Sequence, residues 1–159
     1  MSGVRKRIRH CGRYGIQSDF RQVSYYTYTP TRAPTGRRRK SQTSTPKQRA
    51  LNNKRSARYL EALTHANFGR GDLLLGLSYA EEHTPKDETE AKKEFGNFIR
   101  RLNYRRKKKN LPPARWIAVT EIGKKGRIHH HVIMDAELDR DEVEELWGRG
   151  YANTKRLKP

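Results

Sequence analysis

Two histidines separated by one residue stand in an apolar stretch, residues 127–134, whose sequence RIHHHVIM is typical of a β-strand. Side chains alternate between the two faces of a strand, so His129 and His131 share one face and His130 points to the other. Two imidazoles on one face can act as two ligands for a metal ion. The residue types and their spacing therefore predict a metal centre on this strand.

A carboxylate is predicted to complete this ligand set. Residues 116–121 form a second apolar, β-branched stretch, and Gly123 and Gly126 suit the turn of a hairpin between the two. If the strands pair symmetrically about that turn, Glu121 lies opposite His129. A packed or solvated histidine is the commoner finding, but this run is internal and embedded in Ile, Val and Met. One carboxylate and two imidazoles suit Mn²⁺ or Mg²⁺ when binding is weak, and Zn²⁺ or another transition metal when it is tight.

The elements around this hairpin predict an α+β fold. Apolar periodicity predicts a strand at residues 73–79, a helix at about 86–107, a short helix at 139–147 and a last strand at 151–155. With the hairpin, the order is strand, helix, strand, strand, helix, strand, which is the split β-α-β plan of a ferredoxin-like sandwich with an antiparallel sheet. We expect the helices to cover the sheet face that carries Val132 and Met134, and the metal to lie on the other face.

The net charge points to a polyanionic partner. The 159 residues carry a formal charge of +19, and residues 1–67 contain sixteen Lys and Arg against two acids, which gives about +14 of that total. A dense basic run lies at Arg37, Arg38, Arg39 and Lys40. Nucleic acid is the commonest partner of such a segment. A membrane is not expected as a partner, because no long apolar stripe backs the basic residues.

Composition divides the chain into an arm and a domain. Residues 1–46 are polar and contain three prolines, which predicts a basic, largely disordered arm with one short strand at 23–28. Residues 47–159 are expected to form the domain, with a helix at 47–68 that carries basic residues and a core at 72–159. The single cysteine, Cys11, allows no internal disulfide, and no secretion signal or long apolar run is found, so we expect a cytoplasmic protein.

The hairpin, its His-x-His strand and the preceding Glu121 resemble the metal motif of the HUH endonucleases. The likeness is to the rolling-circle replication initiators of bacterial plasmids and single-stranded DNA phages. Residues 73–79, LLLGLSY, resemble the family's first motif, an apolar strand that ends in Thr or Ser and then Tyr. Residues 67–72 and 97–102 also resemble bacterial members, so the similarity covers about residues 45–159. His130 departs from the pattern, since a bulky apolar residue is usual there, and it has no assigned role.

The resemblance implies initiation of DNA replication by metal-dependent, site-specific binding and nicking of single-stranded origin DNA or an origin hairpin. It implies Mn²⁺ or Mg²⁺ at Glu121, His129 and His131, with host replication proteins as further partners. It also implies a nucleophilic tyrosine in a Tyr-x-x-Lys helix after the histidine strand, which becomes joined to the 5′ phosphate. The only tyrosine there is Tyr151, with Lys155 four residues on and neighbours typical of turn and strand. We therefore expect the chain to end before the tyrosine helix and to have lost nicking.

Three interpretations stay open. The chain is the N-terminal part of a replication initiator, or a cleavage-dead module that binds origin DNA, or a fragment of an HUH transposase or relaxase. In each of them basic side chains are expected to contact DNA phosphates. The expected contacts are Arg37, Arg38, Arg39 and Lys40 in the arm, Arg100, Arg101, Arg105 and Arg106 on the long helix, and Lys124, Lys125 and Arg127 at the hairpin turn.

Overall fold

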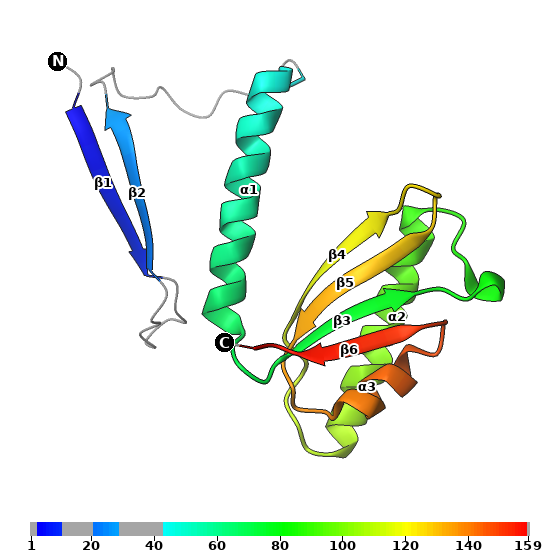
Figure 1. Ribbon diagram of the computed structural model, residues 1–159. Coiled ribbons are helices and arrows are strands. Elements are labelled where there is room, and N and C mark those ends of the chain that lie inside the picture. The colour runs from blue at the N-terminus through cyan, green and yellow to red at the C-terminus, as the bar shows by residue number, and fades with distance from the viewer. Residues whose placement is uncertain (1–2, 11–20, 29–42, 159) are drawn as a thin grey trace. The chain divides into compact units, whose positions relative to one another are not determined.

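The computed structural model describes residues 3–10, 21–28 and 43–158, and it divides the chain into two compact units, Met1–Asn67 and Phe68–Pro159 (Figure 1). The division falls after Asn67, whereas the sequence placed the start of the domain at residue 47. None of the helices in the described ranges is long and apolar enough to cross a lipid bilayer.

The C-terminal unit is an α+β sandwich, as the sequence predicts. Its elements are β3 (Leu73–Ser78), the 3₁₀ turn η1 (Glu81–His83), α2 (Glu88–Lys108), β4 (Trp116–Ile122), β5 (Ile128–Met134), α3 (Arg140–Trp147) and β6 (Ala152–Arg156). The strands form one sheet in the order β4-β5-β3-β6, and every neighbouring pair is antiparallel. Both helices lie on one face of this sheet (Figure 1). This is the arrangement expected of a split β-α-β sandwich.

The core lies between the sheet and the two helices. Alternation along β3 and β5 sends every second side chain toward the helices, where fully burying one large apolar side chain is worth about 1.5–3 kcal/mol. The fully buried apolar residues are Leu73, Leu75 and Leu77 of β3, Val132 and Met134 of β5, Ala91, Phe98 and Leu102 of α2, and Val143 and Trp147 of α3. The face that receives Val132 and Met134 is therefore the helix-covered face, as expected.

Specific polar contacts set the ends of α3. Asp139 is its N-cap and accepts a hydrogen bond from the Asp141 backbone N–H, and the residue after the last turn is Gly148, whose φ of 56° is left-handed. Arg101 of α2 donates to the carbonyls of Leu146 at 3.1 Å and Trp147 at 2.8 Å. The guanidinium thus satisfies carbonyls that the end of a helix leaves unpaired, and it ties α3 to α2.

The N-terminal unit contains a hairpin and a helix. β1 (Gly3–His10) and β2 (Arg21–Tyr28) form an antiparallel two-stranded sheet, and α1 spans Pro46–Asn67, within a residue of the predicted helix. The sequence predicted one short strand in the arm, at 23–28, and the structure has a second, β1, where Val4, Lys6 and Ile8 alternate with arginines in the period of a strand. None of the side chains of α1 is buried.

Gly150 joins α3 to β6 at a point of close backbone approach. Its φ is 149°, and a Cβ atom at this position would lie 2.3 Å from the backbone nitrogen of Ala80 and 2.7 Å from the carbonyl oxygen of Ser78. These are backbone atoms, which cannot move aside for a new methyl group as the end of a flexible side chain can. The turn therefore brings β6 against the end of β3 only because residue 150 lacks a side chain.

We predict that Gly150→Ala lowers the free energy of unfolding by about 3 kcal/mol, because the new methyl group would displace paired backbone. Gly96→Ala is the matched control, since Gly96 lies inside α2 with nothing within 4 Å of a Cβ. It should raise stability by about 0.5–1 kcal/mol. Urea unfolding of both variants, followed by tryptophan fluorescence, measures this. A Gly150→Ala protein as stable as wild type would contradict the close approach.

Candidate metal centre and nucleic-acid interface

The metal ligands predicted from the sequence meet on the sheet face opposite α2 and α3. Leu74 and Val119, which also point to this face, are exposed to solvent, so the face is open. β4 and β5 pair with Glu121 directly opposite His129, as the symmetric hairpin predicts. The turn between them is closed by hydrogen bonds from Gly123 N–H to the Arg127 carbonyl and from Gly126 N–H to the Gly123 carbonyl.

The geometry of these side chains fits a shared cation. Glu121 Oε2 lies 3.2 Å from His131 Nε2 and 3.4 Å from His129 Nε2, and all three ligand atoms lie within 4.8 Å of one another. Two atoms bound to one cation at about 2.0–2.2 Å, at an angle of about 90–110°, lie roughly 2.8–3.6 Å apart. The two distances from the carboxylate fall in that range. Three protein ligands, of which Glu121 and His131 are exposed and His129 is half-buried, also leave coordination positions open, as in catalytic rather than structural sites.

His130, which the sequence left without a role, is fully buried on the helix side of the sheet. Its Nε2 lies 2.7 Å from the hydroxyl of Tyr79, and its Nδ1 lies 3.0 Å from the hydroxyl of Thr120. The ring also packs edge-on against Tyr79 and Trp147. His130 is therefore a core residue that links β5 to β4 and to the segment after β3.

The hydrogen bonds define the tautomer of His130. The Tyr79 hydroxyl donates to the Ala91 carbonyl at 3.1 Å, so its oxygen accepts from His130 Nε2–H, and Nδ1 accepts from Thr120. Burial, together with the neighbouring His129 and His131, lowers the pKa of His130 to about 4. Burial also raises the pKa of Tyr79 to about 12, with Glu94 adding to the shift. Both groups are neutral at neutral pH, and Tyr79 is a structural residue.

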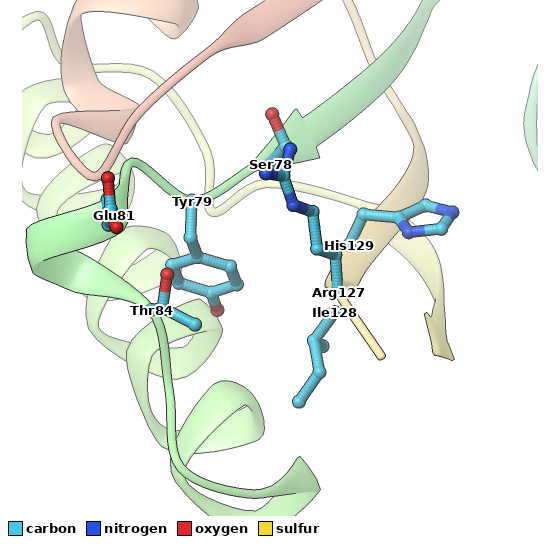
Figure 2. A pocket seen from close by; sticks show the side chains of 7 residues that line it. All are labelled: Ser78, Tyr79, Glu81, Thr84, Arg127, Ile128 and His129. Atoms are coloured by element: carbon cyan, nitrogen blue, oxygen red, sulfur yellow. The ribbon is translucent and has the colours of Figure 1, made fainter. Parts of the chain in front are cut away.

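A hollow of about 580 Å³ opens beside the metal ligands. Its walls come from the end of β3, the η1 segment and the start of β5, and Figure 2 shows the Tyr79 ring projecting into it while the His129 ring turns away. The lining residues are Ser78, Tyr79, Glu81, Thr84, Arg127, Ile128 and His129. The volume lies in the usual range of ligand sites, about 300–1,000 Å³. Arg127 places a positive charge at its rim.

The basic residues expected to contact DNA differ in their exposure and in their partners. Lys124, Lys125 and Arg127 are exposed at the β4–β5 turn, next to the metal ligands. Arg37, Arg38, Arg39 and Lys40 lie outside the described residues. Arg100 is exposed on α2 and is hydrogen-bonded to Asn97. The hairpin turn is therefore where the structure brings cationic side chains next to the candidate metal centre.

The expectation that Arg106 contacts DNA was wrong. Its side chain is fully buried and forms an ion pair with Asp135, the residue after β5. It also donates to the Pro112 carbonyl at 3.3 Å. Arg106 follows Leu102 by four residues, so it continues the buried stripe of α2, and this spacing is the signal that a sequence prediction could have used.

Two other arginines of α2, Arg101 and Arg105, bind groups of α3. Arg105 pairs with Glu142 at 2.8 Å, and Lys109 reaches the same carboxylate at 2.6 Å. Arg101 donates to the last carbonyls of α3, and burial lowers the pKa of its guanidinium. These contacts bind the two helices together. The basic end of α2 is thus largely structural.

Tyr151 lies in the turn before β6 and is 68% exposed. Its carbonyl accepts hydrogen bonds from Ser78 N–H at 2.9 Å and from Ser78 Oγ at 3.3 Å, and Ser78 in turn pairs with His129. Two strand spacings of about 4.8 Å therefore separate Tyr151 from His129 across the sheet. Its position in a turn agrees with the sequence, which predicted no helix here.

The fold and these ligands define a class of small α+β proteins with a candidate metal centre on an open sheet. A family model for the replication-associated protein ORF2 matches residues 72–158, which is more than half of the chain. The chain therefore belongs to this family of replication-associated proteins. No curated protein and no solved structure matches it. Membership indicates a role in DNA replication and an interaction with DNA.

We predict that Tyr79→Phe lowers the free energy of unfolding by about 1–3 kcal/mol, because it leaves the buried His130 Nε2–H without a partner. Tyr104→Phe, at an exposed position of α2, is the control and should change stability by less than about 0.5 kcal/mol. Urea unfolding followed by tryptophan fluorescence compares them. Equal unfolding midpoints for the two variants would contradict the buried hydrogen-bond chain.

We predict that the chain binds one Mn²⁺ and that His131→Ala and Glu121→Gln each weaken binding more than about tenfold, or 1.4 kcal/mol. His83→Ala is the control, since His83 is exposed on η1 outside the cluster. Isothermal titration calorimetry with Mn²⁺ measures the affinities. Absence of binding in the wild type, or an equal loss in His83→Ala, would refute the metal centre.

Proposed function

We propose that this protein initiates DNA replication of the rolling-circle type by binding single-stranded origin DNA at a divalent cation, Mn²⁺ or Mg²⁺, held by Glu121, His129 and His131. The observation that carries the proposal is the convergence of these three side chains on the open sheet face, in a chain of the replication-associated family. The hollow beside His129 supports it, because it can take a nucleotide next to the cation. This is the role that the resemblance to HUH initiators implies.

Each group at the site has a definable part in this function. A cation at the triad would polarise a phosphodiester oxygen of the bound strand. Arg127 at the rim of the hollow is suited to bidentate contact with a neighbouring phosphate, and Lys124 and Lys125 add positive charge along the same strand. These contacts would place one phosphodiester at the triad rather than anywhere along the DNA.

Whether the DNA is cut depends on a nucleophile aligned with that phosphodiester. Tyr151 is the only tyrosine that follows β5 in the sequence, and it sits on the same row of the sheet as His129 but beyond β3. Tyr79 is half-buried, its hydroxyl is hydrogen-bonded to His130 and its pKa is raised, which makes it a poor nucleophile. A second candidate function is therefore an origin-binding protein that does not nick, favoured by the distance of Tyr151 from the triad.

We predict that Mn²⁺ raises the affinity of the chain for a fluorescent single-stranded oligonucleotide by at least about tenfold, because cation and phosphate bind together. His131→Ala should abolish this gain, and His83→Ala should keep it. Fluorescence anisotropy with and without Mn²⁺ measures the effect. Affinity that is independent of Mn²⁺ would contradict the proposed function.

The same incubation distinguishes nicking from binding alone. We expect no covalent adduct between protein and single-stranded DNA on a denaturing gel, given the position of Tyr151. An adduct that Tyr151→Phe abolishes would overturn this expectation and assign Tyr151 as the nucleophile.

A further inference from the structure

The pairing of β1 with β2 sorts the side chains of the hairpin onto two faces. Cross-strand partners share a face, and Arg5 pairs with Tyr26, Arg7 with Ser24 and Arg9 with Gln22. These six residues therefore lie on one side of the ribbon, which we call the arginine face. Every one of its charged residues is an arginine.

The opposite face has a different chemistry. Val4, Lys6, Ile8 and His10 alternate with the arginines, and their partners on this face are Thr27, Tyr25, Val23 and Arg21. Four of these residues, Val4, Ile8, Val23 and Tyr25, are exposed and apolar. The hairpin contains no acidic residue in its two strands. The two faces thus differ in composition: the arginine face carries three arginines among mostly polar partners, whereas the opposite face carries Lys6 and Arg21 beside four exposed apolar residues.

The arginine face has dimensions that match duplex DNA. Alternate residues of a strand lie about 6.7 Å apart, which is close to two base-pair steps of about 3.4 Å each. A two-stranded ribbon fits the major groove. Arginine binds guanine O6 and N7 or a phosphate in bidentate fashion, glutamine pairs with adenine, and serine with either base type. Gln22, Ser24 and the three arginines supply these groups in one row.

Single-stranded DNA suits this face less well. Proteins that bind single strands stack successive bases on several aromatic rings. Among the six residues of the arginine face the one aromatic is Tyr26, and the guanidinium of Arg7 already lies over its ring, 5.5 Å from the centroid. Among these six residues, side chains that can donate hydrogen bonds therefore outnumber aromatic rings.

We propose that the arginine face of the β1–β2 hairpin binds double-stranded DNA in the major groove. This activity goes beyond the single-strand role proposed for the metal centre. The hairpin also lies outside the part of the chain that the family model matches, residues 72–158. The hairpin would hold the duplex while the second unit engages a single strand.

Two neighbouring residues test the proposal with equal changes of charge. Arg7→Gln and Lys6→Gln each remove one positive charge from β1, but on opposite faces. The full chain is titrated into a mixed-sequence 20-base-pair duplex and into one of its strands, across a series of salt concentrations, by fluorescence anisotropy. We expect Arg7→Gln to lower duplex affinity by about tenfold and to reduce the salt slope by about 0.9, the value for one phosphate contact in B-DNA. Lys6→Gln should stay within about twofold of wild type.

The measurements on single-stranded DNA distinguish this proposal from the metal-centre function. Arg7→Gln should leave Mn²⁺-dependent single-strand binding unchanged, whereas His131→Ala should abolish that binding and leave the duplex affinity unchanged. Replacing guanine by 7-deazaguanine, which lacks N7, should weaken duplex binding, and a minor-groove ligand should not displace the protein.

Three results would overturn the duplex proposal. The first is an equal loss of duplex affinity in Lys6→Gln and Arg7→Gln, which would mean that the charge acts without regard to the face. The second is an equal loss for duplex and single strand in Arg7→Gln. The third is displacement by the minor-groove ligand. None of these results affects the Mn²⁺-dependent binding on which the metal-centre function depends.

Discussion

The arrangement of the sheet depends on the hydrogen bonds of the buried His130 imidazole. It hydrogen-bonds to Thr120 of β4 on one side and to Tyr79, just after β3, on the other. A shift of β5 by one residue would reverse every side chain, which would expose His130 and bury His129 and His131. Such a shift would also remove the His130 imidazole from the Tyr79 and Thr120 hydroxyls, and a buried polar group left unpaired costs about 1–3 kcal/mol. The core hydrogen bonds therefore fix the face on which the candidate metal ligands lie.

A second polar interaction holds α2 to the other end of the same strand. Asp135, directly after β5, pairs with Arg106 in the core and accepts a hydrogen bond from the Arg115 backbone N–H at 2.9 Å, just before β4. Breaking a buried ion pair by removing one partner typically costs about 3–5 kcal/mol, because the other charge stays behind. β5 is thus anchored near both ends by polar groups that face α2. Arg106 stabilises the fold, so the positive charge of α2 is a poor indicator of where DNA binds.

The sequence was sufficient where local pattern decides the structure. The Gly123–Gly126 turn and the β-branched strands beside it determined the register of the hairpin, and with it the convergence of Glu121 on the two imidazoles. The role of His130 could not be predicted, because its partner Tyr79 lies 51 residues away in the sequence. Arg106 was misjudged because its charge suggested solvent, although its helical spacing from Leu102 indicated the core. The β1 strand was missed because a run of basic residues reads as a solvated tail until its alternation with Val4 and Ile8 is considered.

The three candidate ligands differ in how firmly the sheet holds them. β5 is an interior strand, paired with β3 and β4 along its whole length, so the backbones of His129 and His131 are fixed on both sides. β4 is an edge strand, and Glu121 lies next to the turn with more than half of its side chain exposed. Rotations of the Glu121 carboxylate can therefore adjust the site to a cation, while the backbones of both histidines stay in place. In the proposed metal centre the fold would fix the position of the ion and Glu121 would set its coordination geometry, which suits a site that a DNA phosphate would enter and leave.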